Sequence, residues 1–260
     1  MRKYLNQVVN ADCLDILKSI PEKSIDFILC DLPYGTTALK WDKVIDFKEL
    51  WVQYERIIKD NAVIALFAIQ PFTTQLIASN LNLYRYSWTW KKDTPTGFLN
   101  ANYCPLKATE DICIFSKGTI GSLSKNPIRF FPQGVVEVNK VKHNNPNSTW
   151  RVNKGYPSTG NALNSDKEYV QKYTNYPSNI LEFARDKNAI HPTQKPVKLC
   201  EYLIRTYSKE GELVLDNCSG SGSSAIACME TNRNFICIEK DEKIWKASQK
   251  RIQKYKESQK

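Results

Sequence analysis

The residues whose types and spacing best suit a chemical reaction form a tetrapeptide near the N-terminus. Residues 25–30 read Ile-Asp-Phe-Ile-Leu-Cys, and Asp31, Leu32, Pro33 and Tyr34 follow directly. The apolar run predicts a buried strand, and open α/β sheets bind their ligands at the carboxyl ends of such strands. We therefore expect the tetrapeptide to lie in a binding site.

The tetrapeptide suits methylation of an exocyclic amine on a nucleobase. Such an amine is a poor nucleophile, because its lone pair is delocalised into the ring. Two acceptors aimed at its N–H bonds, the carboxylate of Asp31 and the backbone carbonyl of Leu32, would favour the pyramidal nitrogen that attacks a methyl group. The ring of Tyr34 could stack on a base taken out of a duplex, and Pro33 would stiffen the turn before that ring.

A glycine-rich loop near the C-terminus is a second candidate site. Residues 212–222 predict a strand and then a tight loop, and a helix and a second strand that ends at Glu239 come next. Gly220 and Gly222 allow the backbone to turn sharply and to approach a ligand closely. Glu239 follows at about the 20-residue interval at which such folds place a carboxylate on ribose hydroxyls. These features predict a cofactor that contains a nucleoside.

The glycine loop alone does not identify the chemistry of that cofactor. The spacing of Gly220, Gly222 and Ala225 also satisfies the dinucleotide fingerprint, so a nicotinamide-dependent oxidoreductase stays an alternative at this point. A DNA-binding protein that keeps the fold without turnover is another. A cytosine-C5 methyltransferase and a zinc deaminase are disfavoured, because the sequence has neither a Pro-Cys pair nor the H-x-E and P-C-x-x-C signature.

The charge of the chain favours a polyanionic partner. The 260 residues are 42% hydrophobic and have a formal net charge of +10. Lysine and arginine that neutralise phosphates release bound counterions, which favours binding to nucleic acid. The N-terminus does not resemble a signal peptide and no apolar run approaches roughly 18 residues, so we expect a cytoplasmic protein without a membrane span.

The cysteines predict neither a metal site nor disulfides. They lie far apart, without C-x-x-C pairs, and several fall inside apolar runs, where cysteine behaves as a small hydrophobic residue. We therefore expect reduced, mostly buried thiols at Cys13, Cys30, Cys104, Cys113, Cys200, Cys218, Cys228 and Cys237.

Apolar runs alternate with amphipathic segments along the chain, which predicts an α/β fold with a largely parallel sheet. Apolar residues at helical spacing predict one helix from Phe47 to Ile58 and another around Leu199 to Ile204. The runs predicted as strands are 25–30, 63–69, 112–115, 213–215 and 235–238.

Residues 119–190 differ from the rest of the chain. They are rich in Asn, Ser, Pro, Gly and Tyr, have weak periodicity, and contain more basic than acidic side chains. Polar, aromatic and basic groups together suit contact with phosphates and base edges, although a surface elaboration is the alternative. We therefore divide the chain into a catalytic part at 1–118, a target-recognition insert at 119–190 and a cofactor-binding part at 191–260.

These motifs resemble those of the DNA amino-methyltransferases, which methylate N6 of adenine or N4 of cytosine. The family's signature Asp/Asn/Ser-Pro-Pro-Tyr/Phe is matched by residues 31–34, and its cofactor motif, similar to Asp-Pro-Phe-x-Gly-Ser-Gly, by residues 216–222. Residues 191–196, His-Pro-Thr-Gln-Lys-Pro, match a segment that helps to hold the methionine end of the cofactor in relatives. Residues 10–14 resemble the family's Gly-Asp-Cys start, whose acid lies near the cofactor's adenine.

The order of the motifs is also that of the family. The catalytic motif comes first, the insert follows and the glycine loop is last, which is the circularly permuted beta arrangement. Two departures stand out. Leu32 replaces the usual first proline, and we expect activity to survive because the proposed hydrogen bond uses a backbone carbonyl. Asn217 and Cys218 replace a proline and a phenylalanine, and that phenylalanine commonly packs beside the cofactor or base in relatives.

The resemblance implies a Rossmann-like methyltransferase fold with a largely parallel, twisted sheet. It implies a site-specific enzyme, of the restriction-modification type, that transfers a methyl group from S-adenosylmethionine to N6 of a flipped adenine in double-stranded DNA. Asp rather than Ser at position 31 favours adenine, and an N4-cytosine methyltransferase is the alternative. Relatives of the beta arrangement often form homodimers. The implied cofactor-binding residues are Asp12, Cys13, His191, Thr193, Lys195, Asp216, Ser219, Gly220, Gly222 and Glu239.

Overall fold

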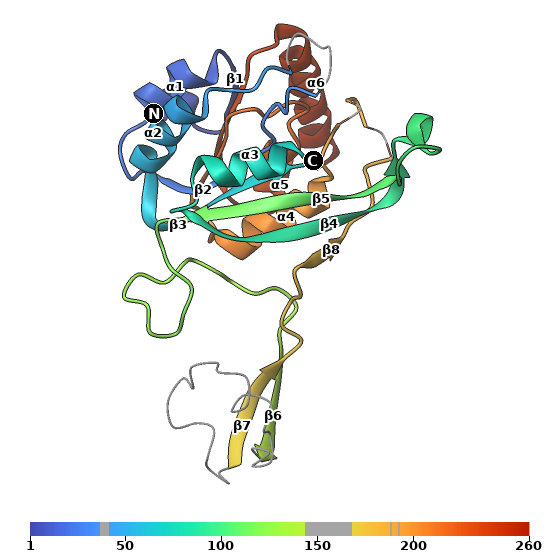
Figure 1. The fold of residues 1–260 in the computed structure, drawn as a ribbon. Helices are drawn as coiled ribbons and strands as arrows, with labels where there is room; N and C mark the ends of the chain where they lie inside the picture. Colours follow the sequence, from blue (N-terminus) through green and yellow to red (C-terminus); the bar gives the residue numbers. More distant parts are fainter. Residues whose placement is uncertain (37–41, 144–167, 188, 192, 260) are drawn as a thin grey trace. The chain divides into compact units, whose positions relative to one another are not determined.

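The computed structural model describes residues 1–36, 42–143, 168–187, 189–191 and 193–259. Among these residues, eight strands form one sheet in the order β1-β10-β9-β2-β3-β5-β4-β8 (Figure 1). The runs predicted as strands are its five adjacent central members, so those predictions are confirmed. The bounds are β1 Gln7–Asn10, β10 Asn234–Glu239, β9 Leu213–Asp216, β2 Ile25–Cys30, β3 Ile58–Ala68, β5 Lys107–Ser116, β4 Tyr84–Thr96 and β8 Ile180–Glu182.

The sheet is largely parallel, as predicted, with an antiparallel part toward one edge. The strands from β1 to β3 pair in parallel, whereas β5 runs antiparallel to both β3 and β4. Every residue of β2 and of β9 is buried, which is typical of parallel strands that are covered on both faces. The carboxyl ends of β10, β9 and β2 therefore lie together at one edge of the sheet.

Helices cover both faces of the sheet (Figure 1). Alternate side chains of β2 belong to different apolar clusters: Ile28 packs with the helices α1 to α3, and Phe27 with α4 to α6. The two helices predicted from apolar spacing are confirmed as α2 and α4. The bounds are α1 Cys13–Ser19, α2 Phe47–Ile57, α3 Phe72–Ser79, α4 Val197–Tyr207, α5 Ser223–Glu230 and α6 Glu242–Ser258.

A small compact unit lies within the predicted insert. The contacts separate Pro132–Pro177 as a small second unit, in which β6 (Val136–His143) and β7 (Glu168–Thr174) pair in an antiparallel sheet. The described residues before and after it, out to 119 and 190, belong to the main unit. There Arg129 binds Glu212 at 2.7 Å, and Leu181 is buried in the core. Part of the predicted insert, residues 144–167, lies outside the described residues.

All eight cysteines lie in the described ranges and are free thiols, as predicted. Six are buried, Cys218 is half-buried and Cys104 is exposed. In the part of the chain that the structure describes, no helix is both long and apolar enough to cross a bilayer.

Candidate active site

A cavity of about 1090 Å³ opens at the carboxyl ends of β9, β2 and β10. Both predicted motifs line it, because the tetrapeptide follows β2 and the glycine loop follows β9. All of the predicted site residues line this cavity except Gly222. Its volume slightly exceeds the roughly 300–1,000 Å³ of a site for a single small ligand, so it can accept a cofactor together with part of a substrate.

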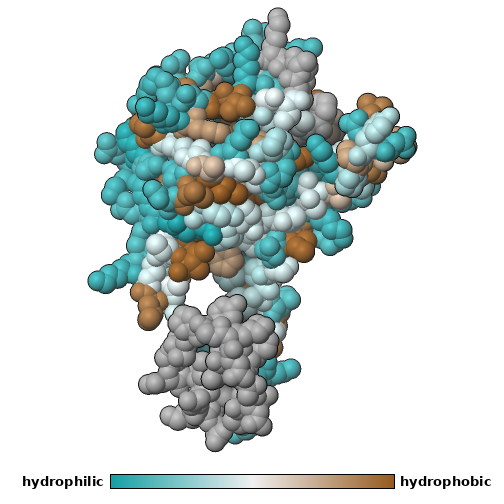
Figure 2. All heavy atoms as spheres, viewed as in Figure 1, coloured by the Kyte–Doolittle hydropathy of each residue, from teal (hydrophilic) through white to brown (hydrophobic). Residues whose placement is uncertain are grey.

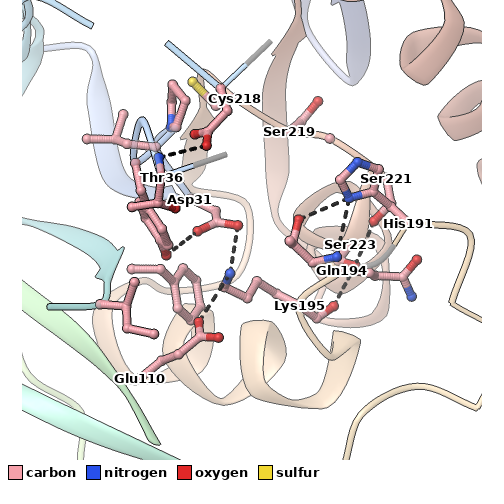
Figure 3. A pocket seen from close by; sticks show the side chains of 18 of the residues that line it. Asp31, Thr36, Glu110, His191, Gln194, Lys195, Cys218, Ser219, Ser221 and Ser223 are labelled. Carbon is pink, nitrogen blue, oxygen red and sulfur yellow. Dashed lines mark hydrogen bonds and ion pairs between the residues drawn. The ribbon is translucent and has the colours of Figure 1, made fainter. Parts of the chain in front are cut away.

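Asp31 is held from both sides in this cavity (Figure 3). The hydroxyl of Tyr34 donates to Asp31 Oδ1 at 2.7 Å, and the ammonium of Lys195 donates to Asp31 Oδ2 at 2.7 Å. The Tyr34 ring lies 4.9 Å, centroid to centroid, from the ring of Phe72. These contacts therefore fix the carboxylate and the aromatic ring that are predicted to meet a base relative to each other.

Leu32 lines the cavity and is also part of the apolar core. It is 3% exposed and belongs to the apolar core beneath β2, together with residues of α1 and α2. A leucine fits this position because its side chain serves packing, which leaves the backbone carbonyl for the predicted hydrogen bond. Pro33 follows and lines the cavity.

Lys195 lies between two carboxylates, and not only beside a cofactor site as the resemblance implied. Its Nζ is 2.7 Å from Asp31 Oδ2 and 3.2 Å from Glu110 Oε2, and its side chain is 8% exposed. The other oxygen of Glu110, Oε1, pairs with Lys92 Nζ at 2.7 Å. These four side chains form a row of alternating charge that we call the charge row.

Sequence reasoning missed Glu110 and Lys92. They lie on β5 and β4, where Trp90 pairs with Glu110 in the strand register. No local motif marks them, because their significance depends on a pairing between strands and on the arrival of Lys195 from a distant segment. The one signal in the sequence is a pair of charges in strands whose alternate residues are apolar.

The charge row determines the ionisation of its members. Burial raises the pKa of Asp31, whereas the Lys195 ammonium acts to lower it. Burial alone would lower the pKa of Lys195, but Asp31 and Glu110 outweigh it and raise that pKa. Burial likewise opposes ionisation of Glu110, but Lys195 and Lys92 outweigh it and lower the Glu110 pKa. Lys195 therefore remains an ammonium with Glu110 ionised beside it.

The two glycines of the loop have different roles. Gly220 has φ +49° and a Cβ there would meet no atom within 4 Å, so its Cα faces open space in the cavity wall. Gly222 has φ +79°, and a Cβ there would lie 3.1 Å from Ile252 Cδ1 of α6. The first glycine fits the predicted approach of a ligand, whereas the second lets the loop turn and α6 pack closely.

Glu239 shapes the loop as well as lining the cavity. Its Oε2 accepts a hydrogen bond from the Gly220 N–H at 2.9 Å, and its Oε1 accepts one from the Asp241 N–H at 2.8 Å. Nearby, Ser219 Oγ is buried and has no hydrogen-bond partner among the described residues. A buried polar atom normally has a partner, so Ser219 fits a site whose ligand supplies one.

The remaining predicted residues, Asp12, Cys13, His191 and Thr193, also line the cavity. Asp12 caps α1 through the Leu14 N–H at 2.9 Å and pairs with Lys240 at 2.8 Å. Cys13 is buried. His191 Nδ1 lies 3.0 Å from Thr193 Oγ1.

Two further hydrogen-bonded contacts fix neighbouring loops. The hydroxyl of Ser223, the first residue of α5, donates to the Lys195 carbonyl at 2.7 Å, which joins the glycine loop to the charge row. Beyond the tetrapeptide, Asp42 accepts hydrogen bonds from the backbone N–H groups of Gly35 at 2.8 Å and Thr36 at 2.9 Å. Sequence reasoning missed Asp42.

Asp216 gives the site a pH-dependent element. Its buried carboxylate accepts hydrogen bonds from the Cys218 N–H at 3.1 Å and from the Ser224 hydroxyl. Burial raises its pKa to about 7, from an ordinary value of 3.8. Between about pH 4 and pH 7, the Asp216 carboxyl therefore keeps a proton in the folded protein that it releases in the unfolded chain. Its contribution to the free energy of unfolding is largest at low pH and falls as the pH rises.

We predict that Asp216→Asn removes a pH dependence of stability. The contribution of the wild-type Asp216 carboxyl to the free energy of unfolding is fully present below about pH 4. It falls as the pH rises to about 7, by up to about 1.4 kcal/mol for each pH unit. Urea unfolding of both proteins at about pH 5 and about pH 8 measures the effect. Relative to the variant, the wild type should lose stability at the higher pH. If the free energies of unfolding of the wild type and the variant differ by the same amount at both pH values, the pH dependence does not come from Asp216. The matched control is Asp15→Asn, because Asp15 is exposed.

Known proteins share both the sequence pattern and the fold. The family model of the N6/N4 DNA methylases matches residues 25–250. Type II methyltransferase M.HpaI of Haemophilus parainfluenzae is 26% identical over 260 residues, covering 95% of this chain and 74% of that protein. Type II methyltransferase M.HindIII of Haemophilus influenzae is 24% identical over 318 residues, covering 94% of this chain and 94% of that protein.

Solved structures agree in fold. The PvuII DNA methyltransferase, described as cytosine-N4-specific, has a TM-score of 0.62 at 14% identity, covering 94% of this chain and 84% of that chain. The complex of M1.HpyAVI with SAM has a TM-score of 0.58 at 21% identity, covering 94% of this chain and 98% of that chain. These likenesses confirm the predicted methyltransferase fold. Because the family model spans most of the sequence, the chain belongs to the N6/N4 DNA methylase family.

Proposed function

We propose that this protein transfers a methyl group from S-adenosylmethionine to N6 of adenine in duplex DNA. The observation that carries the proposal is the position of Asp31, fixed at the end of β2 in the same cavity as the glycine loop. Membership of the N6/N4 family removes the oxidoreductase alternative. Asp rather than Ser at position 31 supports adenine over cytosine.

The residues around the glycine loop fit S-adenosylmethionine. Gly220 leaves room for close approach, Ser219 Oγ lacks a partner among the described residues, and the Glu239 carboxylate lines the cavity beside them. Glu239 would bind the ribose hydroxyls, and Asp12, which also lines the cavity, would lie near the adenine of the cofactor, as the resemblance implies. When bound, this cofactor supplies a methyl group already activated by the sulfonium. M1.HpyAVI, which has the same fold, was solved with SAM.

Asp31 retains the capacity to accept a hydrogen bond from a base amine. An ionised carboxylate offers about four acceptor positions. Tyr34 uses one on Oδ1 and Lys195 uses one on Oδ2, so a position on each oxygen remains. These two donors also orient the carboxylate, which reduces the reorganisation needed when the amine arrives. Lys195 and the Tyr34 hydroxyl therefore act on the base through Asp31, whereas the Tyr34 ring would stack on the base directly.

The charge row keeps the site near neutrality. Positive charge develops on the nitrogen as it attacks, and the Asp31 carboxylate stabilises it. The ammonium of Lys195 would oppose that charge if it stood alone. Glu110 pairs with both Lys195 and Lys92, so the four charges cancel across the row. The base amine thus faces a carboxylate without an uncompensated cation behind it.

Duplex DNA fits the charge of the chain and the second unit. The net charge is +10, and within Pro132–Pro177 the exposed side chains of β6 and β7 include lysines and tyrosines. They are Lys140, Lys142, Tyr169, Lys172 and Tyr173. Lysines neutralise phosphates, and tyrosines contact sugars and base edges. We propose this unit as part of the surface that reads the target.

The direct test is to identify the methylated nucleoside. The full chain is incubated with labelled S-adenosylmethionine and mixed-sequence duplex DNA, the DNA is digested to nucleosides, and sequencing maps the modified context. Label in N6-methyladenine supports the proposal. Label in N4-methylcytosine would keep the family reaction and overturn adenine as the target. Tight DNA binding without label would indicate a catalytically silent relative.

We predict that Lys195→Met moves the acid limb of the methylation rate to higher pH. Without the ammonium, burial of Asp31 has less opposition and its pKa rises further. The carboxylate must be ionised to act on the amine, so transfer is lost as pH falls through that pKa. Single-turnover rates across pH, with saturating cofactor and DNA, measure the shift. An acid limb at the wild-type pH would contradict the role of Lys195. Lys198→Met, whose side chain is 72% exposed, is the matched control.

We predict that Glu239→Ala weakens S-adenosylmethionine binding by about 1.5–3 kcal/mol, the value of hydrogen bonds to a charged group. Because Glu239 also accepts from the Gly220 N–H, loop disorder must be separated from loss of the ribose contact. Titration calorimetry with the cofactor and its 2′-deoxyribose analogue separates them. The wild type should prefer the ribose form and the variant should not. If the variant still prefers the ribose form of the cofactor, Glu239 does not bind the ribose hydroxyls. The control is Glu242→Ala, because Glu242 is exposed.

A further inference from the structure

The connection between β4 and β5 presents large apolar side chains to solvent. We call residues 97–106 the β4–β5 tip, and all ten of them are exposed. Phe98 is 80% exposed, Leu99 is 96% exposed and Tyr103 is 88% exposed. Figure 2 shows brown, apolar atoms at the right-hand end of the molecule, where Figure 1 places this tip. A cluster of exposed large apolar groups usually marks a binding surface.

The tip is an ordered projection. Its backbone makes hydrogen bonds from the Asn100 N–H to the Gly97 carbonyl at 3.0 Å and from the Tyr103 N–H to the Asn100 carbonyl at 2.9 Å. Below it, Thr96 pairs with Lys107 in the strand register. The apolar side chains are thus displayed on a fixed turn.

The tip forms part of the rim of the active-site cavity. Gly97, Asn100 and Cys104 line that cavity together with the catalytic residues. The strands that lead into the tip also contain Lys92 and Glu110 of the charge row. An apolar projection therefore adjoins the mouth through which a base must enter.

We propose that the β4–β5 tip enters the DNA duplex beside the base that is flipped, with Phe98 and Leu99 occupying space in the stack. This inference rests on the proposed function. A base leaves the stack at a cost of a few kcal/mol, and apolar side chains inserted between base steps offset that kind of cost in other DNA-binding proteins. Lys107 and Arg185 also line the cavity, where they can meet the phosphates that flank the opened step.

The position of the tip favours DNA over a second copy of this chain as its occupant. The tip adjoins the cavity that receives the base, so a partner protein bound there would crowd the entrance. Charge complementarity supports the same choice, because lysine and arginine side chains flank the apolar residues at the rim.

The test compares two duplexes that differ only in how firmly the target base is held. One contains the methylation site with a correctly paired target, and the other places the same target opposite a mismatched base. A mismatch lowers the cost of opening. The variant is Phe98→Ala with Leu99→Ala. The matched control is Leu123→Ala, because Leu123 is also 96% exposed but lies beyond the other end of β5.

We expect kcat/KM of the double variant to fall about tenfold or more on the paired duplex and to stay within about twofold on the mismatched one. The control should stay within about twofold on both. An equal loss on both duplexes, or no loss on the paired one, would overturn the role of the tip while leaving the proposed function standing. A wild-type dimer that the double variant fails to form would assign the tip to self-association and overturn it as well. If the wild type methylates neither duplex, the proposed function fails and the inference fails with it.

Discussion

A buried ammonium between two carboxylates, Lys195 between Asp31 and Glu110, joins three parts of the chain that are remote in sequence. Desolvation of such charges is costly, and the arrangement is stable only because each charge has partners of opposite sign. Removal of one member of a buried pair typically costs about 3–5 kcal/mol. The row therefore constrains β2, the β4–β5 pair and the segment before α4 to meet at one place, and the orientation of Asp31 follows from that constraint.

The sheet explains how the catalytic and cofactor motifs come together despite their separation along the chain. Both follow parallel strands, β2 and β9, that are neighbours and share one direction. Their carboxyl ends must then open on the same edge. The order of the motifs in the sequence has little influence on this geometry, since the sheet order determines which ends adjoin. Ser223 completes the link by donating from the start of α5 to the Lys195 carbonyl.

Local sequence patterns predicted the features that local physics determines. The six buried residues of β2 are apolar except Asp26, and the predicted bounds of this strand are those observed. The β4 strand was not predicted, although its aromatic side chains alternate with polar ones from Tyr84 to Lys91, a pattern typical of a half-buried strand. The partner of Lys195 lies 164 residues away, so the resemblance placed Lys195 at the cofactor while the structure places it on Asp31. The edges of the second unit depend likewise on contacts such as that of Arg129 with Glu212, which no local pattern encodes.

If the Asp31 carboxylate acts on the base and not on the cofactor, its removal should affect methyl transfer and leave cofactor binding almost unchanged. Single-turnover methyl transfer by Asp31→Ala, measured together with its affinity for S-adenosylmethionine, separates the two effects. We expect transfer to fall by at least about 100-fold, comparable with removal of one stabilising group at a reacting atom, and cofactor affinity to stay within a few-fold of the wild type. A variant that keeps most of its transfer rate would show that the Asp31 carboxylate does not act on the base.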